Sequence, residues 1–311
     1  MTEQPSVATV SEPTPAPAPK KRRRRFGDRS DGRRLRTLPP MALVSPYIMK
    51  SRNTSSNSIA DSVEISNMEQ YIQQKRREGL QHFGAMHVFL AAYVRTVSQR
   101  PAINRFISGQ KIFARNNIEI ALTIKKDMKL NAPDTCVKAV FQPDATAEEV
   151  YATLDAIVSR EKASAGLDSS FDSTAKVLRF IPGLLLKFTV WLLTLLDYFG
   201  LLPKKLLALS PFHGSLVITS MGSLGIPPIY HHLYDFGNAP VFLAFGAKRR
   251  TYETQRDGSV AERRYIDYKV VTDERICDGF YYASALKYLR HILKNPSVLS
   301  ERPTEIIDDI D

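Results

Sequence analysis

The sequence predicts an α+β fold, an α/β sandwich built on one β-sheet. The chain has 311 residues, of which 43% are hydrophobic, and this is enough apolar material to fill one large core. Segments with a helical spacing of apolar residues alternate with shorter runs rich in β-branched and aromatic residues. Helices and strands mixed in this order favour helices packed on a single sheet.

The N-terminal segment, residues 1–37, is predicted to be a disordered arm. It is rich in proline and alanine and then in arginine, a composition that buries too little apolar surface to order itself. Much of the formal charge of +11 lies between Lys20 and Arg36. The arm is either a solvated tail or a contact for an acidic partner, an anionic membrane surface or nucleic acid. No basic sheet motif studded with aromatic residues accompanies it, which argues against nucleic acid.

The first half of the domain predicts a strand, two helices and a hairpin. Residues 62–79 begin with SVEI, typical of a strand, and continue with apolar residues at helical spacing. Met86–Gln99 is apolar on most sides and predicts a buried helix. Between Ile107 and Thr123, the β-rich runs KIFAR and IEIALTI flank Asn116 and Asn117. Because asparagine tolerates the left-handed conformation of tight turns, this segment predicts a hairpin.

The second half predicts a helix, three strands and a closing helix. The first of these, Glu148–Lys162, is amphipathic. The strand-like runs are LVITSMGSLGI, APVFLAFGAKRR and RRYIDYKVVTDERI. The closing helix runs from about Gly279 to Leu293 and is ended by Asn295 and Pro296. Residues 299–311 form an acidic tail.

The strongest hydrophobic signal is an apolar helical insertion at about 177–209, long enough for a membrane span of roughly twenty residues. Against a span stand two charged and two proline residues inside it: Lys187, Asp197, Pro182 and Pro203. The alternatives are a helix buried in the core or in a trimer interface, and a helix lying in a membrane surface. Lys204, Lys205 and the basic arm favour the membrane surface.

The most specific motif lies near the C-terminus, where the chain reads DERICDGFYYASALKYLRHILKNP from Asp273 onward. Upstream, ITSMGSLGI at 218–226, NAP at 238–240 and FLAFGAKRR at 242–250 form a second set of landmarks. The N-terminal half adds SVEISNMEQYIQQKRREG and PAINRFI more loosely. Together these resemble the catalytic domain of the 2-oxoacid dehydrogenase dihydrolipoamide acyltransferases, whose signature is His-Arg-x-x-Asp-Gly before an amphipathic helix.

The resemblance implies a chloramphenicol acetyltransferase-like fold over residues 38–298, with a mixed β-sheet, packed helices and a homotrimeric assembly. In that family the active site lies between subunits, where a histidine accepts the proton of a coenzyme A or dihydrolipoamide thiol and the thiolate attacks a thioester. The implied substrate is a coenzyme A or related thioester, with no metal and no lipoyl group on this chain. The resemblance names neither the acyl donor nor the acceptor.

Carried over position by position, the resemblance implies roles for several residues. Thr219 is the hydroxyl that stabilises the oxyanion, with Ser220 as the alternative one residue along. Asp278 is a structural carboxylate that orients its loop through an arginine, and Arg275 is a structural residue of the same site. Gly279 is the tight start of the last helix.

Glu274 stands where the family keeps its catalytic histidine. A carboxyl group with a pKa of about 4.3 is poorly matched to a thiol of about 8.5, so Glu274 is a poor base. His231 and His232, in the loop after the Thr219 strand, are the alternative bases. Because adjacent residues of an extended chain face opposite ways, at most one of them is expected to point into the site. The hypotheses are an acyltransferase using one of these three bases, and an inactive scaffold or regulatory trimer of the same fold, a pseudoenzyme.

The remaining histidines and both cysteines are assigned no catalytic role. The histidines expected to be structural are His82, His87, His213 and His291. Cys136 and Cys277 are far apart, with no Cys/His spacing around either, so neither a disulfide framework nor a zinc site is indicated. With no secretory signal at the N-terminus, we expect a cytoplasmic protein, with membrane association through 177–209 as the alternative.

Overall fold

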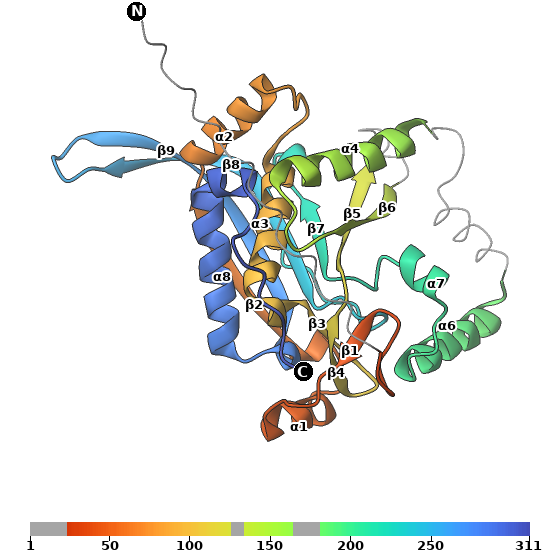
Figure 1. The fold of residues 1–311 in the computed structure, drawn as a ribbon. Coiled ribbons are helices and arrows are strands. Elements are labelled where there is room, and N and C mark those ends of the chain that lie inside the picture. Colours follow the sequence, from red (N-terminus) through yellow and green to blue (C-terminus); the bar gives the residue numbers. More distant parts are fainter. Residues whose placement is uncertain (1–23, 126–133, 164–180) are drawn as a thin grey trace, which may run out of the picture.

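A six-stranded β-sheet forms the centre of the molecule (Figure 1). The computed structural model describes residues 24–125, 134–163 and 181–311. In chain order the strands of this sheet are β2 (Ser56–Glu64), β5 (Ile118–Lys125), β6 (Asp134–Phe141), β7 (Leu216–Ser220), β8 (Val241–Thr254) and β9 (Val260–Asp273). Their spatial order is β2-β9-β8-β7-β5-β6. Because β7 pairs in parallel with β5 and β8 while the other neighbours are antiparallel, the sheet is mixed, which confirms the predicted fold class.

Helices cover one face of this sheet (Figure 1). They are α2 (Ser66–Arg77), α3 (Ala85–Gln99), α4 (Ala147–Ala163) and α8 (Gly279–Lys294). The structure confirms four predictions made for these segments. They are a strand and helix over 62–79, a buried helix over Met86–Gln99, an amphipathic helix over Glu148–Lys162 and a closing helix. Elsewhere lie α1 (Pro40–Ile48), α6 (Gly183–Tyr198), α7 (Lys204–Leu209) and the short 3-10 helices η1 (Asn53–Ser55), η2 (Pro101–Asn104), η3 (Gly222–Leu224), η4 (Glu274–Ile276) and η5 (Pro296–Ser300).

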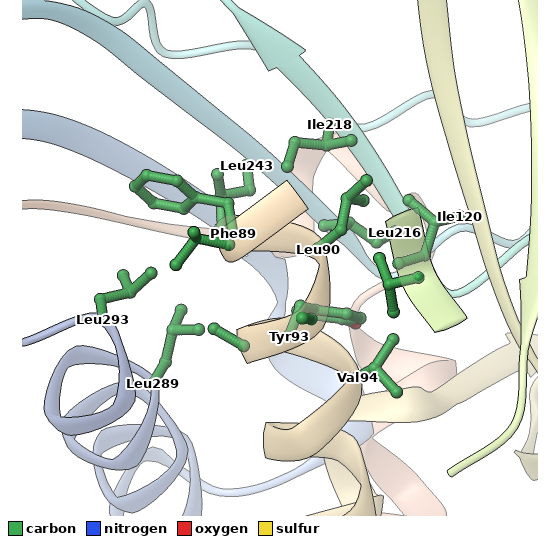
Figure 2. Packing of buried hydrophobic residues seen from close by; sticks show 14 of the residues in the cluster. Phe89, Leu90, Tyr93, Val94, Ile120, Leu216, Ile218, Leu243, Leu289 and Leu293 are labelled. Atoms are coloured by element: carbon green, nitrogen blue, oxygen red, sulfur yellow. The ribbon is translucent and has the colours of Figure 1, made fainter. Parts of the chain in front are cut away.

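The main core lies between the helices and the sheet. Figure 2 shows Leu90 of α3 between Leu216 and Ile218 of β7, Phe89 of α3 beside Leu243 of β8, and Leu289 of α8 next to α3. All of these side chains are buried. From Val88 to Ser98 every residue of α3 is buried, which explains why this stretch of its sequence is almost wholly apolar.

The loop 227–237 crosses the opposite face of the sheet. We call this face of the sheet the loop face. It is formed by side chains at paired positions of β7, β8 and β9: Val217, Thr219, Phe242, Ala244, Lys269 and Val271. Leu233 of the loop packs on Phe242, Ala244 and Val271 in a small buried cluster. Since side chains alternate along a strand, Thr219 shares this face with Val217, whereas Ile218 points to the helices.

A separate three-stranded sheet lies beside the first and disproves the predicted hairpin. Its strands, in the order β1-β4-β3, are β1 (Gly32–Arg34), β4 (Lys111–Arg115) and β3 (Arg105–Ser108). KIFAR is β4, whereas IEIALTI is β5 of the large sheet, so the two runs do not pair. The tight turn lies instead at Gly109 and Gln110, whose φ values of 54° and 57° suit a type I′ hairpin joining β3 to β4. Asn116 and Asn117 have no positive φ, and the chain there passes between the two sheets.

Residues 24–37 belong to the folded domain, which corrects the predicted boundary at 38. β1 pairs with β4, and the guanidinium of Arg29 is buried, donating to Asp31 at 2.8 Å and to Asp197 of α6 at 2.7 Å. The acidic tail also packs on the domain, since Asp309 accepts from Arg105 at 2.7 Å. Composition does not show such contacts, because Asp197 and Asp309, which pair with Arg29 and Arg105, lie far along the chain. Residues 1–23 of the predicted arm lie outside the described residues.

α6 and α7 make up most of the apolar stretch at 177–209, of which residues 177–180 lie outside the described part. α6 lies at the edge of the domain (Figure 1), and Asp197 is its only buried residue. The prediction of a helix buried in the core is therefore wrong for the single chain. Across the described ranges no helix is both long enough and apolar enough to cross a bilayer.

Asp197 is expected to make the stability of the protein sensitive to acid. Burial by itself raises the pKa of Asp197, but the imidazole of His213, whose Nε2 lies 3.5 Å from the carboxylate, and the charge of Arg29 outweigh it and lower that pKa to about 2. Ionised Asp197 therefore stabilises the folded state fully above its unfolded pKa of about 3.9, and this contribution is lost as the pH falls towards 2. Denaturant unfolding should show Asp197→Asn about 2 kcal/mol less stable than the wild type at pH 7, with the difference shrinking below about pH 4.

The control for this prediction is Glu305→Gln near the C-terminus, which removes an exposed carboxylate that makes no ion pair in the described part of the chain. It should leave both the stability and its pH dependence unchanged within about 0.5 kcal/mol. A pH-independent difference between Asp197→Asn and the wild type would contradict the assignment.

Candidate active site

The C-terminal end of β9 is held by a buried carboxylate, Asp273. Each of its two oxygens accepts a hydrogen bond of 2.8 Å from the guanidinium of Arg275. Nε of Arg52 lies 3.6 Å from one of these oxygens. Arg275 also donates to the carbonyl of Met49 at 2.9 Å, and Arg52 donates to the carbonyl of Tyr234 at 2.7 Å. Asp273 therefore joins β9, the end of α1 and the loop 227–237 through two arginines.

Asp278 has a different partner from the one that the family resemblance implies. Its carboxylate accepts from the backbone N–H of Tyr281 at 2.8 Å and caps the N-terminus of α8. The arginine of the motif, Arg275, pairs with Asp273 instead, because the turn over η4 points its side chain inward. Gly279 is the first residue of α8, as expected, and a Cβ there would meet no atom within 4 Å.

Glu274 is exposed at the first position of η4. It makes no hydrogen bond or ion pair with any described residue, whereas its neighbours Asp273 and Arg275 are buried. Glu274 and Arg275 therefore face opposite ways, and the carboxylate of Glu274 is free to meet a substrate or a second chain.

Thr219 lies half-buried near the end of β7 on the loop face, beside Ala244 of β8. Ser220, the alternative, has the opposite orientation along the strand, on the side of Ile218. The structure thus places the Thr219 hydroxyl, rather than that of Ser220, on the same face as the loop 227–237.

His231 and His232 lie on one side of their loop, which contradicts the expectation that they face opposite ways. Their rings stack with centroids 4.5 Å apart, and His231 also stacks on Phe242 of the loop face at 4.1 Å. Nδ1 of His231 contacts the carbonyl of His232 at 2.8 Å. The loop is not a regular strand, so the alternation of side chains does not apply there. His232 is exposed, and no described side chain bonds to its ring nitrogens.

Lys269 of the loop face and its partner Tyr230 in the loop 227–237 were missed by sequence reasoning. Lys269 of β9 is paired with Ala244, which is paired with Thr219. The ammonium of Lys269 lies 4.0 Å above the ring of Tyr230. A lysine inside the apolar run YKVV was a usable signal, because a charged residue in a central strand needs a partner.

Thr219 and Glu274 do not share a site within one chain. Through Ala244, Thr219 lies at the same height of the sheet as Lys269 of β9. Glu274 is five residues beyond Lys269 in the chain, just after the end of β9. At about 3.3 Å per residue, this separates the two by more than roughly 15 Å. The two residues can meet only if they come from two copies of the chain.

The other titratable groups that the structure describes form no second catalytic centre. Burial raises the pKa of the Cys277 thiol to about 12, which keeps it protonated. Burial lowers the pKa of His87 to about 4, and its ring accepts from the backbone of Gly84 at the start of α3. His213 is buried, and its Nδ1 is hydrogen-bonded to the hydroxyl of Ser210 at 2.7 Å. Among the residues with assigned positions, no three His, Cys, Asp or Glu residues are grouped so as to hold a metal ion.

Comparison with solved structures shows the fold. The chain is similar to the dihydrolipoamide acetyltransferase of Azotobacter vinelandii, with a TM-score of 0.54 and 12% identity over 85% of this chain and 93% of that one. It is also similar to a probable dihydrolipoamide acetyltransferase of Listeria monocytogenes, with a TM-score of 0.53 and 14% identity over 84% and 95%.

A third similar structure is the cubic core of a pyruvate dehydrogenase multienzyme complex, with a TM-score of 0.52 and 12% identity over 85% and 93%. No family model matches the chain, and no curated protein matches it in sequence. The chain has the chloramphenicol acetyltransferase-like fold of these acyltransferase cores.

Proposed function

We propose that this protein transfers an acyl group from a coenzyme A or related thioester, in a site formed between two copies of the chain. The observation that carries the proposal is the loop face, where a hydroxyl, an imidazole pair and an ammonium lie on one side of the sheet. Thr219 stabilises the oxyanion of the tetrahedral intermediate, and Lys269 adds positive charge to the same face.

His232 is the proposed general base. Its imidazole is exposed, and an imidazole is a better partner for exchanging a proton with a thiol than a carboxylate is. His231 is held between Phe242 and His232, so it positions the His232 ring rather than reacting itself. In this scheme a thiol acceptor gives its proton to His232 and its thiolate attacks the thioester carbonyl. The bond between the acyl carbon and the coenzyme A sulfur then breaks, and the departing coenzyme A thiolate takes the proton from His232.

The second copy is proposed to bring Glu274 towards Thr219. In the Azotobacter enzyme a serine, a histidine and an asparagine have been investigated for roles in the catalytic mechanism. That histidine and asparagine are four residues apart, the spacing of Glu274 and Asp278 here. A homotrimer, as the resemblance implies, would supply such a site at each interface, with Glu274 orienting the acceptor.

Replacing Thr219 with valine tests the proposal. Loss of an oxyanion donor should lower the rate of acyl transfer by about a hundredfold to a thousandfold, with little change in stability.

Replacing His232 with glutamine should lower the rate of acyl transfer by about a hundredfold or more, and Glu274→Gln should lower it by only about threefold. The rate is measured by mass spectrometry after incubation with acyl-coenzyme A and candidate thiol, amine and alcohol acceptors.

Thr254→Val, an exposed threonine of β8, is the matched control and should keep the wild-type rate. If Glu274→Gln lowered the rate of acyl transfer as much as Thr219→Val does, Glu274 rather than His232 would be the general base. Absence of turnover in the wild type, or full activity in Thr219→Val, would favour the alternative of an inactive scaffold of the same fold. The exposed, unpaired Glu274 at the histidine position is the observation that supports this alternative.

A further inference from the structure

α6 presents an apolar surface that its own domain leaves uncovered. Its less exposed residues recur every three or four positions, at Leu186, Thr189, Leu193 and Leu196, and mark the side that faces the domain. The other side carries a second stripe of large apolar residues, Leu184, Phe188, Trp191 and Leu195, which are 85%, 54%, 56% and 38% exposed. We call this second set the outer stripe. It continues into Phe199 and Leu201, each 65% exposed.

The charges around the outer stripe are of one sign. Lys187 lies within α6, and Lys204 and Lys205 begin α7, all three exposed. From residue 181 to residue 234 the only acidic residue is Asp197, which is buried and points inward to Arg29 at 2.7 Å. An apolar stripe flanked by lysines, with tryptophan and phenylalanine on it, has the composition of helices that lie in the surface of anionic membranes.

The ion pair between Arg29 and Asp197 brings a second basic segment to the foot of α6. Arg24, Arg25 and Phe26 lie just before Arg29 and are exposed, with Phe26 fully so. Lys204 lines the same cavity of about 970 Å³ as Arg24 and Arg25. Asp311 of that cavity pairs with Arg25 at 3.0 Å, whereas Lys204 stays exposed. Two separate apolar and basic elements are therefore held on one part of the domain, and stable membrane attachment generally needs two such signals.

We propose that α6 lies flat in the surface of an anionic lipid bilayer, with its outer stripe among the acyl chains and its lysines at the headgroups. The sixteen residues of α6 extend for about 24 Å, which is too short to span the apolar layer but sufficient to lie along it. This inference is independent of acyl transfer. It gives the protein a place at a membrane, whatever reaction the loop face performs.

Vesicle binding of the whole protein tests the inference. Cosedimentation should show binding to vesicles of phosphatidylcholine mixed with phosphatidylglycerol, and much weaker binding to phosphatidylcholine alone. The fluorescence of Trp191 should shift to the blue on binding, because the indole leaves water. Both signals should weaken with salt, as expected for attraction to an anionic surface.

Two variants separate the apolar from the charged contribution. The triple variant Leu184→Ser, Phe188→Ser and Leu195→Ser keeps Trp191 and should bind at least about a hundredfold more weakly. The charge variant Lys187→Glu, Lys204→Glu and Lys205→Glu should also lose about a hundredfold, since each basic residue near an anionic surface contributes about fivefold. The control variant Val140→Ser, Val260→Ser and Val298→Ser alters exposed valines on other elements and should bind like the wild type.

Sedimentation velocity without lipid distinguishes a membrane from a second copy as the partner of α6. The outer stripe variant should keep the wild-type assembly and thermal unfolding temperature. Dissociation of that variant would show that another subunit covers α6 and would overturn the inference. Wild-type protein that binds neither kind of vesicle, or an outer stripe variant that binds as tightly as the wild type, would overturn it equally.

Discussion

Replacing Asp273 with alanine is expected to destabilise the folded protein by about 3–5 kcal/mol. The side chain of Asp273 is fully buried, and its carboxylate compensates the charges of Arg275 and Arg52, which are themselves buried. Its removal would leave two guanidinium groups in the interior without a counter-charge, and this cost exceeds the loss of the hydrogen bonds alone. Chemical denaturation followed by circular dichroism measures the effect.

Glu274→Ala is the matched control, because it removes the adjacent carboxylate from an exposed position. Its free energy of unfolding should stay within about 0.5 kcal/mol of the wild type. A loss below about 1 kcal/mol for Asp273→Ala would show that the two arginines find water or other partners. Such a result would remove the reason for assigning the structural carboxylate to Asp273.

Phe89→Ala should cost about 3–5 kcal/mol of folding free energy. Phe89 of α3 is fully buried, and its ring lies parallel to that of Phe245 of β8 at 4.4 Å, with Tyr268 edge-on at 5.9 Å. The truncation leaves a cavity between the helices and the sheet, where the rigid strands on one side and α3 on the other limit collapse. Unfolding in denaturant at neutral pH gives the value.

Phe26→Ala provides the comparison for this substitution, because the Phe26 side chain is fully exposed. It should change the free energy of unfolding by less than about 0.5 kcal/mol in the absence of lipid. If Phe89→Ala were no more destabilising than Phe26→Ala, the contact between α3 and the sheet would not be the main core.

Most elements could be predicted because their patterns are local. The apolar run of α3 and the stripe of α8 at Tyr282, Ala285, Leu289 and Ile292 follow from sequence spacing, since both helices bury a face against the same sheet. The hairpin failed because pairing is not local. β4 and β5 are equally good strands, and only the partners β1, β3, β6 and β7 decide that they belong to different sheets.

The candidate site was predicted in part. Its motif located Glu274, Arg275, Asp278 and Gly279 around the start of α8, and their positions there follow the motif. The pairing of Arg275 with Asp273 rather than with Asp278 could not be predicted, because it depends on the direction in which the η4 turn points each side chain. The contribution of Lys269 depends on strand register for the same reason.

The sequence by itself determined the fold class and the extent of most helices and strands. These depend on periodicity and motif, which are properties of neighbouring residues. Only the tertiary structure decided that Arg29 is buried against Asp197, that α6 lies outside the core, and that Thr219 lies level with Lys269, away from Glu274 along the direction of β9. Such facts arise from contacts between residues far apart in the chain, whose energies depend on burial and register that no local pattern contains.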